Sequence, residues 1–523
     1  MSLHSSLEAP LALAENGEPK KGTAFWMVMG TLVVSTFMAA LDATDLSVAL
    51  PTIAVDLHGT TTMAFWAGIA FLLSSCVFSP LFGAFSEIFG RRLLVLTAIT
   101  LFTGGAMICG LARNMAVLVL GRTAQGIGSG GIISLTEIII CDLVPLRERG
   151  LYFGIQGMIW AVATVIGPII GGLFAKHDWR WIFWINLPIS LLSFPLIIRY
   201  LNLNLELVPL SVKFRRIDWL GICIFVPCIS TFLTALTWGG TMYPWSSYQT
   251  YLPLILSTAG LLLFLFVESQ YATEPIIPVK VFLTQTGSVS YLGVFLHGVI
   301  VWGVLYYLPV YFEGVWEMTP VGSGIALLPS TFTTAPAAAA VGILVQKIGK
   351  YRWSIWIGWT VSLIGALTLV FLNTQLILWR RIIPLMILGI GTGFNFAGPP
   401  FAIQCSVSNE DTPLALSTFA FIRTFGQVFG VAVGSSIFQN GFKVPGFEAS
   451  DAISQIGLIK TLPPPIRLAF QKGLSVALRH LWFALAGLSA IGLITSLATQ
   501  ELSLDRELET KQGLKHQESD KSI

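Results

Sequence analysis

The sequence predicts an all-α polytopic membrane protein. Hydrophobic residues make up 54% of the 523 residues and charged residues only 11%, and the mean hydropathy is +0.77. Soluble domains carry about 25% charged residues, so this chain lacks the polar surface of a water-exposed fold. Long apolar stretches recur along the chain, and backbone groups in lipid must be satisfied within each stretch, which favours helices over an open sheet.

Fourteen apolar stretches are long enough to cross a membrane, because a spanning helix needs about 20 mostly apolar residues. We expect spans at 25–49, 62–84, 93–112, 115–138, 151–174, 181–203, 218–238, 251–269, 287–311, 321–346, 353–372, 382–405, 414–438 and 479–499. The polar residues 1–24 do not resemble a cleaved signal peptide, so the first span should direct insertion into the membrane.

The distribution of Lys and Arg predicts the orientation. If the N-terminus is placed in the cytoplasm, most of the 30 Lys and Arg residues fall on the cytoplasmic side, as the positive-inside rule requires. We therefore expect both termini to be cytoplasmic. The plasma membrane is the expected location, with a vacuolar or vesicle membrane as the alternative.

The chain shows no sign of an active site. Its six cysteines lie in apolar stretches and its six histidines are scattered, so neither a metal cluster nor a disulfide framework is indicated. No G-x-x-x-x-G-K-[ST] nucleotide loop occurs, so ATP is not the expected energy source. No block of basic residues suggests nucleic-acid binding. We therefore expect no enzyme activity, no catalytic residue, no metal and no cofactor.

Three glycine-rich motifs occur twice, in the same order. The pairs are "GAFSEIFGR" at 83–91 with "GILVQKIGK" at 342–350, "GIGSG" at 126–130 with "GIGTG" at 389–393, and "GPIIG" at 167–171 with "GVAVG" at 430–434. Their nearly constant spacing indicates a duplicated bundle, and parallel six-span repeats are a known transporter architecture. The predicted domains are a cytoplasmic tail at 1–24, a six-span bundle at 25–203, inserted spans 7 and 8 with linkers at 204–286, a second six-span bundle at 287–499 with a long outside loop at 439–478, and a cytoplasmic tail at 500–523.

The two copies differ in their charged residues. The first copy holds Asp42, Arg122 and Pro168, whereas the matching positions of the second hold Val301, Leu385 and Val431. We therefore expect ion coupling in the first half and a cavity shaped mostly by the second.

Five motifs resemble those of the major facilitator superfamily, specifically its fourteen-span drug:proton antiporters of fungi. They are "LDATDLSVALP" in the first span, "GAFSEIFGRR" after the second, "GRTAQGIGSGG" in the fourth, "VIGPIIGG" in the fifth and "WRWIFWINLP" (179–188) at the entry to the sixth. The resemblance covers about residues 25–500. It implies the major facilitator fold, in which two six-helix bundles, here with two inserted helices, expose a central site to each side of the membrane in turn.

The chain departs from these motifs at three positions. The loop motif usually has Asp then Arg, where this chain has Glu87 and Ile88, and the fifth-span motif usually opens with Gly, where it has Ala163. The position of Asp45 is usually apolar or small in such proteins.

Asp42, Arg122 and Gln125 are the predicted proton-coupling residues. A charge at the centre of a bilayer costs about 2.5–3.5 kcal/mol on insertion scales, so it needs a partner and usually has a function. Arg cannot be deprotonated in practice, which makes Asp42 or a backbone carbonyl the expected partner of Arg122. The alternative is a fixed ion pair that only holds helices together.

Asp45 lies on the same helix face as Asp42, three residues further on. It either raises the proton affinity of Asp42 or binds a cationic substrate. The interpretation that we favour from the sequence is simpler: a residue near the outer end of its span that reaches water.

Further candidates are less specific. His297 and Arg423 are possible secondary sites in the second half, and Glu137 is expected to reach the membrane surface or a loop partner. The aromatic residues that could line an apolar pocket are Trp302, Tyr306, Tyr307, Phe394 and Phe396, but as a set they are expected to pack helices or lie at the membrane interface rather than contact a ligand. The resemblance assigns Gly167, Pro168, Gly171 and Gly172 to the antiporter motif and Gly83, Glu87, Gly90, Arg91 and Arg92 to a cytoplasmic gating loop, for which close packing and positive-inside anchoring are the respective alternatives.

The sequence thus predicts a proton-coupled efflux transporter of small lipophilic organic molecules such as drugs, toxins or secondary metabolites. The alternative is a proton-coupled importer of metal chelates or nutrients on the same fold. The expected partners are the small-molecule substrate, protons and the lipid bilayer, without nucleic acid, and the chain is expected to be a monomer.

Overall fold

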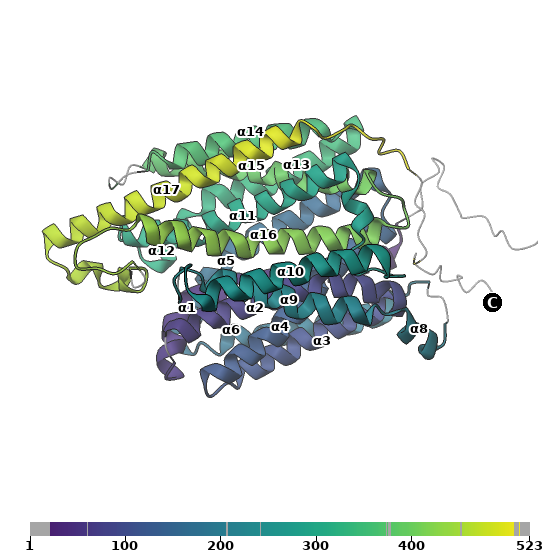
Figure 1. Cartoon of the computed structure of the whole chain (residues 1–523), viewed down its shortest axis with the longest axis horizontal. Helices are drawn as coiled ribbons and strands as arrows, with labels where there is room; N and C mark the ends of the chain where they lie inside the picture. The colour runs from purple at the N-terminus through teal and green to yellow at the C-terminus, as the bar shows by residue number, and fades with distance from the viewer. Residues whose placement is uncertain are drawn as a thin grey trace, which may run out of the picture.

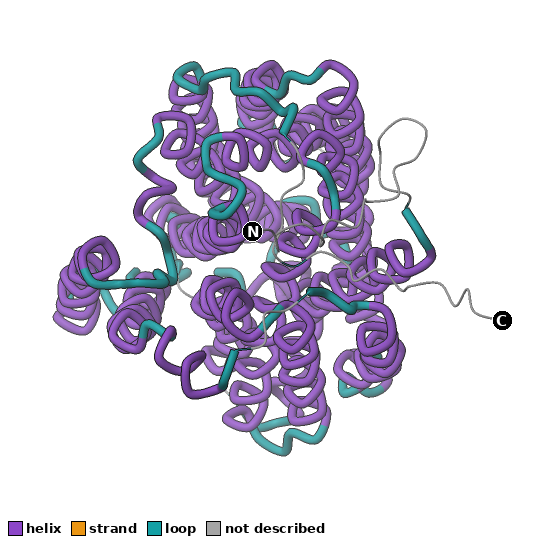
Figure 2. The backbone as a smooth tube through the Cα atoms, turned by 90° about the vertical axis from the view of Figure 1, so that its right-hand side faces the viewer, coloured by secondary structure: helices purple, strands orange, loops and turns teal. Residues whose placement is uncertain are grey.

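The computed structural model describes residues 21–59, 61–204, 208–240, 242–372, 374, 378–449, 452–506 and 512. In these residues regular structure is helical, apart from isolated bridge residues such as the pair Gly239 and Tyr243. Thirteen helices of this part of the chain are long and apolar enough to cross a membrane, so the protein is a multi-pass membrane protein. Figure 2 views many of the helices nearly end-on, as expected of a bundle with roughly parallel axes.

The helices fall into two groups joined by a linking segment (Figure 1). The N-terminal group consists of α1 (Thr23–Asp56), α2 (Thr61–Phe89), α3 (Arg91–Gly110), α4 (Met115–Leu143), α5 (Arg149–His177), α6 (Trp181–Trp184) and α7 (Asn186–Tyr200). The link holds α8 (Leu210–Arg216), α9 (Trp219–Trp238) and α10 (Tyr248–Gln270). The C-terminal group consists of α11 (Gln285–Gly314), α12 (Pro320–Ala326), α13 (Leu328–Ile348), α14 (Arg352–Leu369), α15 (Leu378–Cys405), α16 (Thr412–Gly441) and α17 (Pro464–Ser496). Short 3₁₀ helices lie at Leu146–Glu148, Val279–Phe282 and Ser454–Thr461.

The eleventh predicted span, 353–372, corresponds to α14, which is not among the thirteen. This helix has 18 residues, begins with Arg and includes three tryptophans, and it is shorter than its neighbours α13, α15 and α17. It nevertheless packs lengthwise beside α15 and α17.

Helix boundaries differ most from the sequence prediction in three places. The sixth span is divided into α6 and α7, and the tenth into α12 and α13. The last helix begins at Pro464 instead of 479, so the connection after α16 is much shorter than the predicted loop 439–478. The early turns of α17 are amphipathic: Phe470 and Leu474 are fully buried while charged residues alternate with them, and a search for apolar stretches therefore misses them.

Both described ends of the chain lie at the same end of the bundle. Lys21 pairs with Glu148, and Arg147 of the same turn pairs with Asp505. We call this the terminal end and the other the opposite end. An even number of membrane crossings follows, whereas the side of the membrane that each end faces stays a prediction, as do the domain boundaries at 203 and 287.

The two groups touch directly at the terminal end. Gly150 of α5 lies against Gly342 of α13, where the absence of side chains lets the backbones approach closely. Arg149 donates a hydrogen bond to the amide oxygen of Gln404 at 2.6 Å. The α9–α10 pair packs beside both groups, through contacts of α9 with α2 and α16.

Candidate functional site

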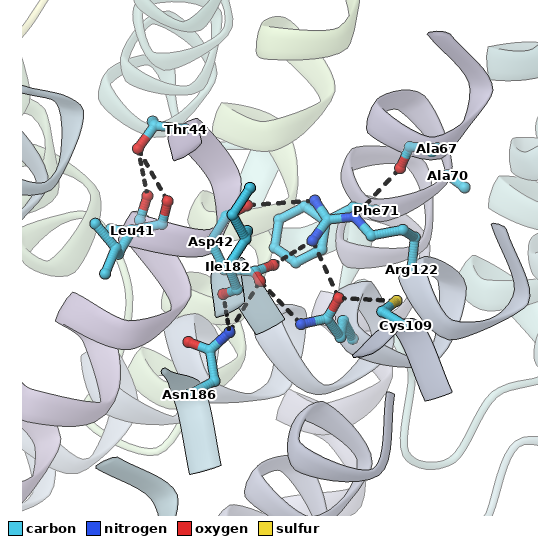
Figure 3. A network of polar contacts seen from close by, with 12 residues as sticks. Leu41, Asp42, Thr44, Ala67, Ala70, Phe71, Cys109, Arg122, Ile182 and Asn186 are labelled. Atoms are coloured by element: carbon cyan, nitrogen blue, oxygen red, sulfur yellow. Dashed lines mark hydrogen bonds and ion pairs between the residues drawn. The ribbon is translucent and has the colours of Figure 1, made fainter. Parts of the chain in front are cut away.

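A buried polar cluster surrounds Asp42 in the middle of the N-terminal group (Figure 3). The Asp42 carboxylate forms an ion pair with Arg122 of α4 through Oδ2. Its Oδ1 accepts hydrogen bonds from Gln125 Nε2 at 2.9 Å and from Asn186 Nδ2 of α7 at 3.1 Å. Both Asp42 and Arg122 are almost fully buried, at 0% and 1% exposure. Two neighbouring helices, α4 and α7, therefore hold the carboxylate through both of its oxygens.

The three guanidinium nitrogens of Arg122 all have hydrogen-bond partners, as both oxygens of Asp42 do. Its Nη1 donates to Gln125 Oε1 at 3.1 Å, its Nη2 to the backbone oxygen of Asp42 at 3.3 Å, and its Nε to the backbone oxygen of Ala67 at 3.3 Å. The guanidinium also lies 4.3 Å from the ring centroid of Phe71, a cation–π contact. The structure thus pairs the three predicted coupling residues, and Arg122 takes both expected kinds of partner.

Glycines of α4 explain how this helix carries Arg122 to the site. Gly126 packs against the backbone of Phe71 on α2, and Gly121 against Cys109 on α3. A side chain at either position would collide with the neighbouring helix, so the repeated glycines let α4 lie close between α2 and α3. Sequence reasoning missed Asn186, although an amide inside the apolar "WRWIFWINLP" motif is the signal that would have indicated it.

Asp45 corrects the interpretation that we favoured from the sequence. It does not reach water: its exposure is 0%, and neither carboxylate oxygen has a hydrogen-bond partner. The reason is the packing of α1 against α5, which covers this turn of the helix.

The antiporter motif of α5 lies on that turn. Gly171 packs against the backbone of Asp45, and Gly167 against Thr44, whose hydroxyl donates to the backbone oxygen of Ala163 at 3.1 Å. Pro168 lies inside α5, where it removes one backbone donor, and beside Gly324 of α12. Gly172 faces Val321 of the same helix. This motif therefore connects the Asp45 turn with the C-terminal group.

A cavity lies between the two groups, with about 1020 Å³ of empty space when its open side is included. Most of its wall comes from α11, α13, α15 and α16, and α5 supplies the rest. Apolar side chains in the wall include Trp160, Trp302, Leu305, Leu388 and Phe396, and polar ones include Thr164, Thr331, His297, Arg423 and Gln427. The wall is thus largely apolar with a few polar groups, as is usual for small-molecule sites.

The aromatic and histidine candidates divide between this wall and the packing around it. Trp302 and Phe396 line the cavity, and Tyr306 stacks on Trp302. Tyr307 lies outside it and donates to the backbone oxygen of Val431 at 3.1 Å. Phe394 packs against Trp353. His297 lines the cavity with its Nε2 3.0 Å from the Thr392 backbone oxygen.

A second buried ion pair joins the two groups and corrects the expectation for Glu137. Instead of reaching a surface, Glu137 of α4 is 1% exposed and accepts a hydrogen bond from Arg423 Nη2 of α16 at 2.7 Å. The Arg423 guanidinium lies near the rings of Phe419 and Phe396, at 4.9 and 5.5 Å, and also lines the cavity. The other Glu137 oxygen, Oε2, has no hydrogen-bond partner.

The predicted gating loop forms a charge cluster at the terminal end. Arg91 is buried and pairs with Glu87 at 2.6 Å and with Asp142 of α4 at 3.0 Å. Arg92 donates to the amide oxygen of Asn202 at 2.7 Å. Gly90 has a φ of 92°, which favours glycine at the sharp turn between α2 and α3, and Gly83 packs against Ser417 of α16.

No group of three or more His, Cys, Asp or Glu side chains that could hold a metal ion occurs among the described residues.

Comparisons with known proteins identify the family of the chain. Residues 32–431 match the family model of the Major Facilitator Superfamily. Among similar sequences, "MFS transporter L2" of Phoma sp. is 40% identical over 515 residues, covering 96% of this chain and 86% of its own. "MFS-type efflux pump LUC4" of Fusarium sp. is 35% identical, covering 97% and 93%. The "Acurin A biosynthesis cluster MFS-type transporter" of Aspergillus aculeatus is 36% identical, covering 96% and 93%.

Two solved structures share the fold at low identity. The human organic anion transporter MFSD10 aligns with a TM-score of 0.58 and 13% identity, over 91% of this chain and all of its own. The proton:xylose symporter XylE aligns with a TM-score of 0.58 and 14% identity, over 89% and 98%. The family match covers most of the chain and the relatives align along nearly their whole length, so the chain belongs to the Major Facilitator Superfamily, whose members transport small molecules across membranes and are not enzymes.

Proposed function

We propose that the protein is a proton-coupled efflux transporter of small lipophilic organic molecules that works by alternating access. The cavity between the two groups of helices is the observation that carries the proposal. Its wall is largely apolar, and both groups contribute to it, so a relative movement of the groups would expose a bound molecule to one end or the other.

Proton coupling is supported by the buried charges of the N-terminal group. Ionisable side chains inside a membrane are costly and usually mark ion or proton pathways. Phe71, which the Arg122 guanidinium contacts, also lines a small pocket that shares Trp160, Arg423 and Gln427 with the cavity. The cluster is therefore close to the cavity, and a change of its charge would affect the helices that bind substrate.

Export rather than import is supported by the names of two relatives, one an efflux pump and the other a transporter of a biosynthesis cluster. By analogy, the cargo is a secondary metabolite or a toxic compound of similar polarity. We further propose a monomer in the plasma membrane with both termini in the cytoplasm, so that the terminal end faces the cell interior.

Deletion of the gene in the producing organism, combined with vesicle transport, tests this function. Cells without the protein should accumulate a lipophilic compound, and vesicles that carry the protein should load that compound only when their interior is acidic. Reduced uptake of an external nutrient in the deletion strain would favour the importer instead. Loading that ignores the pH gradient would contradict proton coupling.

A further inference from the structure

The two aspartates of α1 have opposite surroundings. Asp42 receives charged and neutral donors at both carboxylate oxygens, from Arg122, Gln125 and Asn186. Asp45, one helical turn further on, has two buried oxygens and no hydrogen-bond partner for either. Two groups of the same chemistry therefore lie side by side in environments that favour different charge states.

An ionised carboxylate is stable in a membrane interior only when it is paired, and Asp42 meets that condition while Asp45 does not. A neutral carboxylic acid, in contrast, tolerates burial without a charged partner. We infer that Asp45 is the group that carries the proton, whereas Asp42 stays ionised as the fixed partner of Arg122. This inference rests on the proposed proton coupling and names the residue within it.

The charges that face Asp45 agree with this division. Asp42 on the same helix adds a negative charge that opposes ionisation of Asp45, and Arg122 of α4 adds a positive charge that is already shared with Asp42. The glycine turn of α5 packs directly on the Asp45 backbone and supplies no charge. α7 contributes Asn186, an amide that already donates to Asp42.

The same packing provides a way to expose the group. The α5 turn that covers Asp45 lies on its other side against α12 of the C-terminal group, through Pro168 and Gly172. If the two groups separate there, water reaches the α5 turn that packs on the Asp45 backbone. A path along this turn, between α1 and α5, then connects the Asp45 carboxyl group to water. Asp45 then exchanges its proton with water at the opposite end, and closure returns it to the buried, protonated state.

Infrared spectroscopy of the purified full-length protein tests the inference without any substrate. Wild-type protein at neutral pH should show the carbonyl stretch of a protonated carboxyl group, and Asp45→Asn should lose that intensity. Glu137→Gln should keep the part of the intensity that Asp45→Asn loses. An unchanged band in Asp45→Asn would overturn the assignment.

Transport in proteoliposomes gives the second measurement, with rhodamine 6G as the lipophilic probe. A pH gradient with an acidic interior should raise rhodamine 6G accumulation by the wild type several-fold above the level without a gradient. Asp45→Asn should lose this enhancement completely and catalyse only gradient-independent exchange, and Asp45→Glu should recover part of it. Wild-type behaviour of Asp45→Asn would refute the role of Asp45 while leaving the proposed function intact. Exchange by the wild type that ignores the gradient would refute proton coupling itself.

Discussion

Two buried ion pairs differ in where they lie and how well they are satisfied. Asp42–Arg122 lies within the N-terminal group, and every partner of the pair comes from that group. Glu137–Arg423 joins α4 to α16, and one of the Glu137 oxygens has no partner. We call these the intra-group pair and the inter-group pair. The difference indicates that the first is a permanent part of one rigid group, whereas the second must break whenever the groups separate at the terminal end.

Loss of Arg122 should have the largest effect. Arg122→Leu leaves the Asp42 carboxylate buried without its cation, which typically costs about 3–5 kcal/mol. We expect a large fall in Tm, measured by thermal unfolding in detergent. Arg180→Leu is the matched control, because its pair with Asp56 is partly exposed and is worth about 1 kcal/mol or less. Equal shifts in Tm for the two variants would show that the intra-group pair does not stabilise its group.

The second-largest effect is expected from a side chain added at Gly342, where the two groups touch. Gly342→Val places methyl groups against the Gly150 backbone at the terminal end, and such overpacking typically costs about 1–3 kcal/mol. Because the strain disappears when the groups separate, the variant should favour the state open at the terminal end and lose transport. Gly104→Val is the control, since an added side chain at Gly104 meets no neighbour within 4 Å. Normal transport by Gly342→Val would contradict closure at this contact.

Neutralising the inter-group pair should have a smaller effect on the equilibrium between the states closed and open at the terminal end. Glu137→Gln removes the charge that holds Arg423, and a change of about 1.4 kcal/mol would raise the open population about tenfold. Cys141 reports this opening, because its thiol is buried against Gln404 of the C-terminal group, with 3.3 Å between Sγ and Oε1.

Labelling rates with a thiol reagent provide the measurement, on variants that retain a single cysteine. The rate at Cys141 should rise in Glu137→Gln, while the rate at Cys109 should not change. Cys109 contacts Gln125 beside the intra-group pair, at 3.4 Å, and so lies within one group. A parallel increase at both cysteines would indicate general loosening instead of separation of the groups.

The sequence predicts the membrane spans and the ion pair within one group. It does not predict the contacts that depend on how helices and groups pack together. Hydropathy indicated the spans, and a lone Arg in an apolar stretch indicated a carboxylate partner, so Arg122 and Asp42 could be matched. The pairing of Glu137 with Arg423 could not, because it joins residues 286 positions apart and depends on how the groups dock. The burial of Asp45 likewise depends on the approach of α5, which the glycines of its motif permit but do not reveal.

The smallest expected effect lies at the exposed opposite end of the N-terminal group. A hydrogen bond from Trp179 lowers the pKa of Asp56 despite the opposing effect of burial, with further lowering by Arg180. A group with a depressed pKa stabilises the folded state above its unfolded pKa of about 3.9 and loses that contribution as the pH falls through its folded pKa. Asp56→Asn should therefore lower Tm slightly at pH 7, and the difference should vanish in acid. A difference that grows on acidification would contradict this sign.

Distances between spin labels on the two groups test alternating access most directly. One labelled pair, at Leu93 and Lys350, spans the terminal end, and another, at Arg113 and Leu378, spans the opposite end; all four side chains are exposed. When the pH is changed across a neutral range, we expect the population with a long distance at one end to grow as the population with a long distance at the other end shrinks. Glu137→Gln should shift both distributions toward opening at the terminal end. Distances that remain constant, or that lengthen together at both ends, would contradict the account.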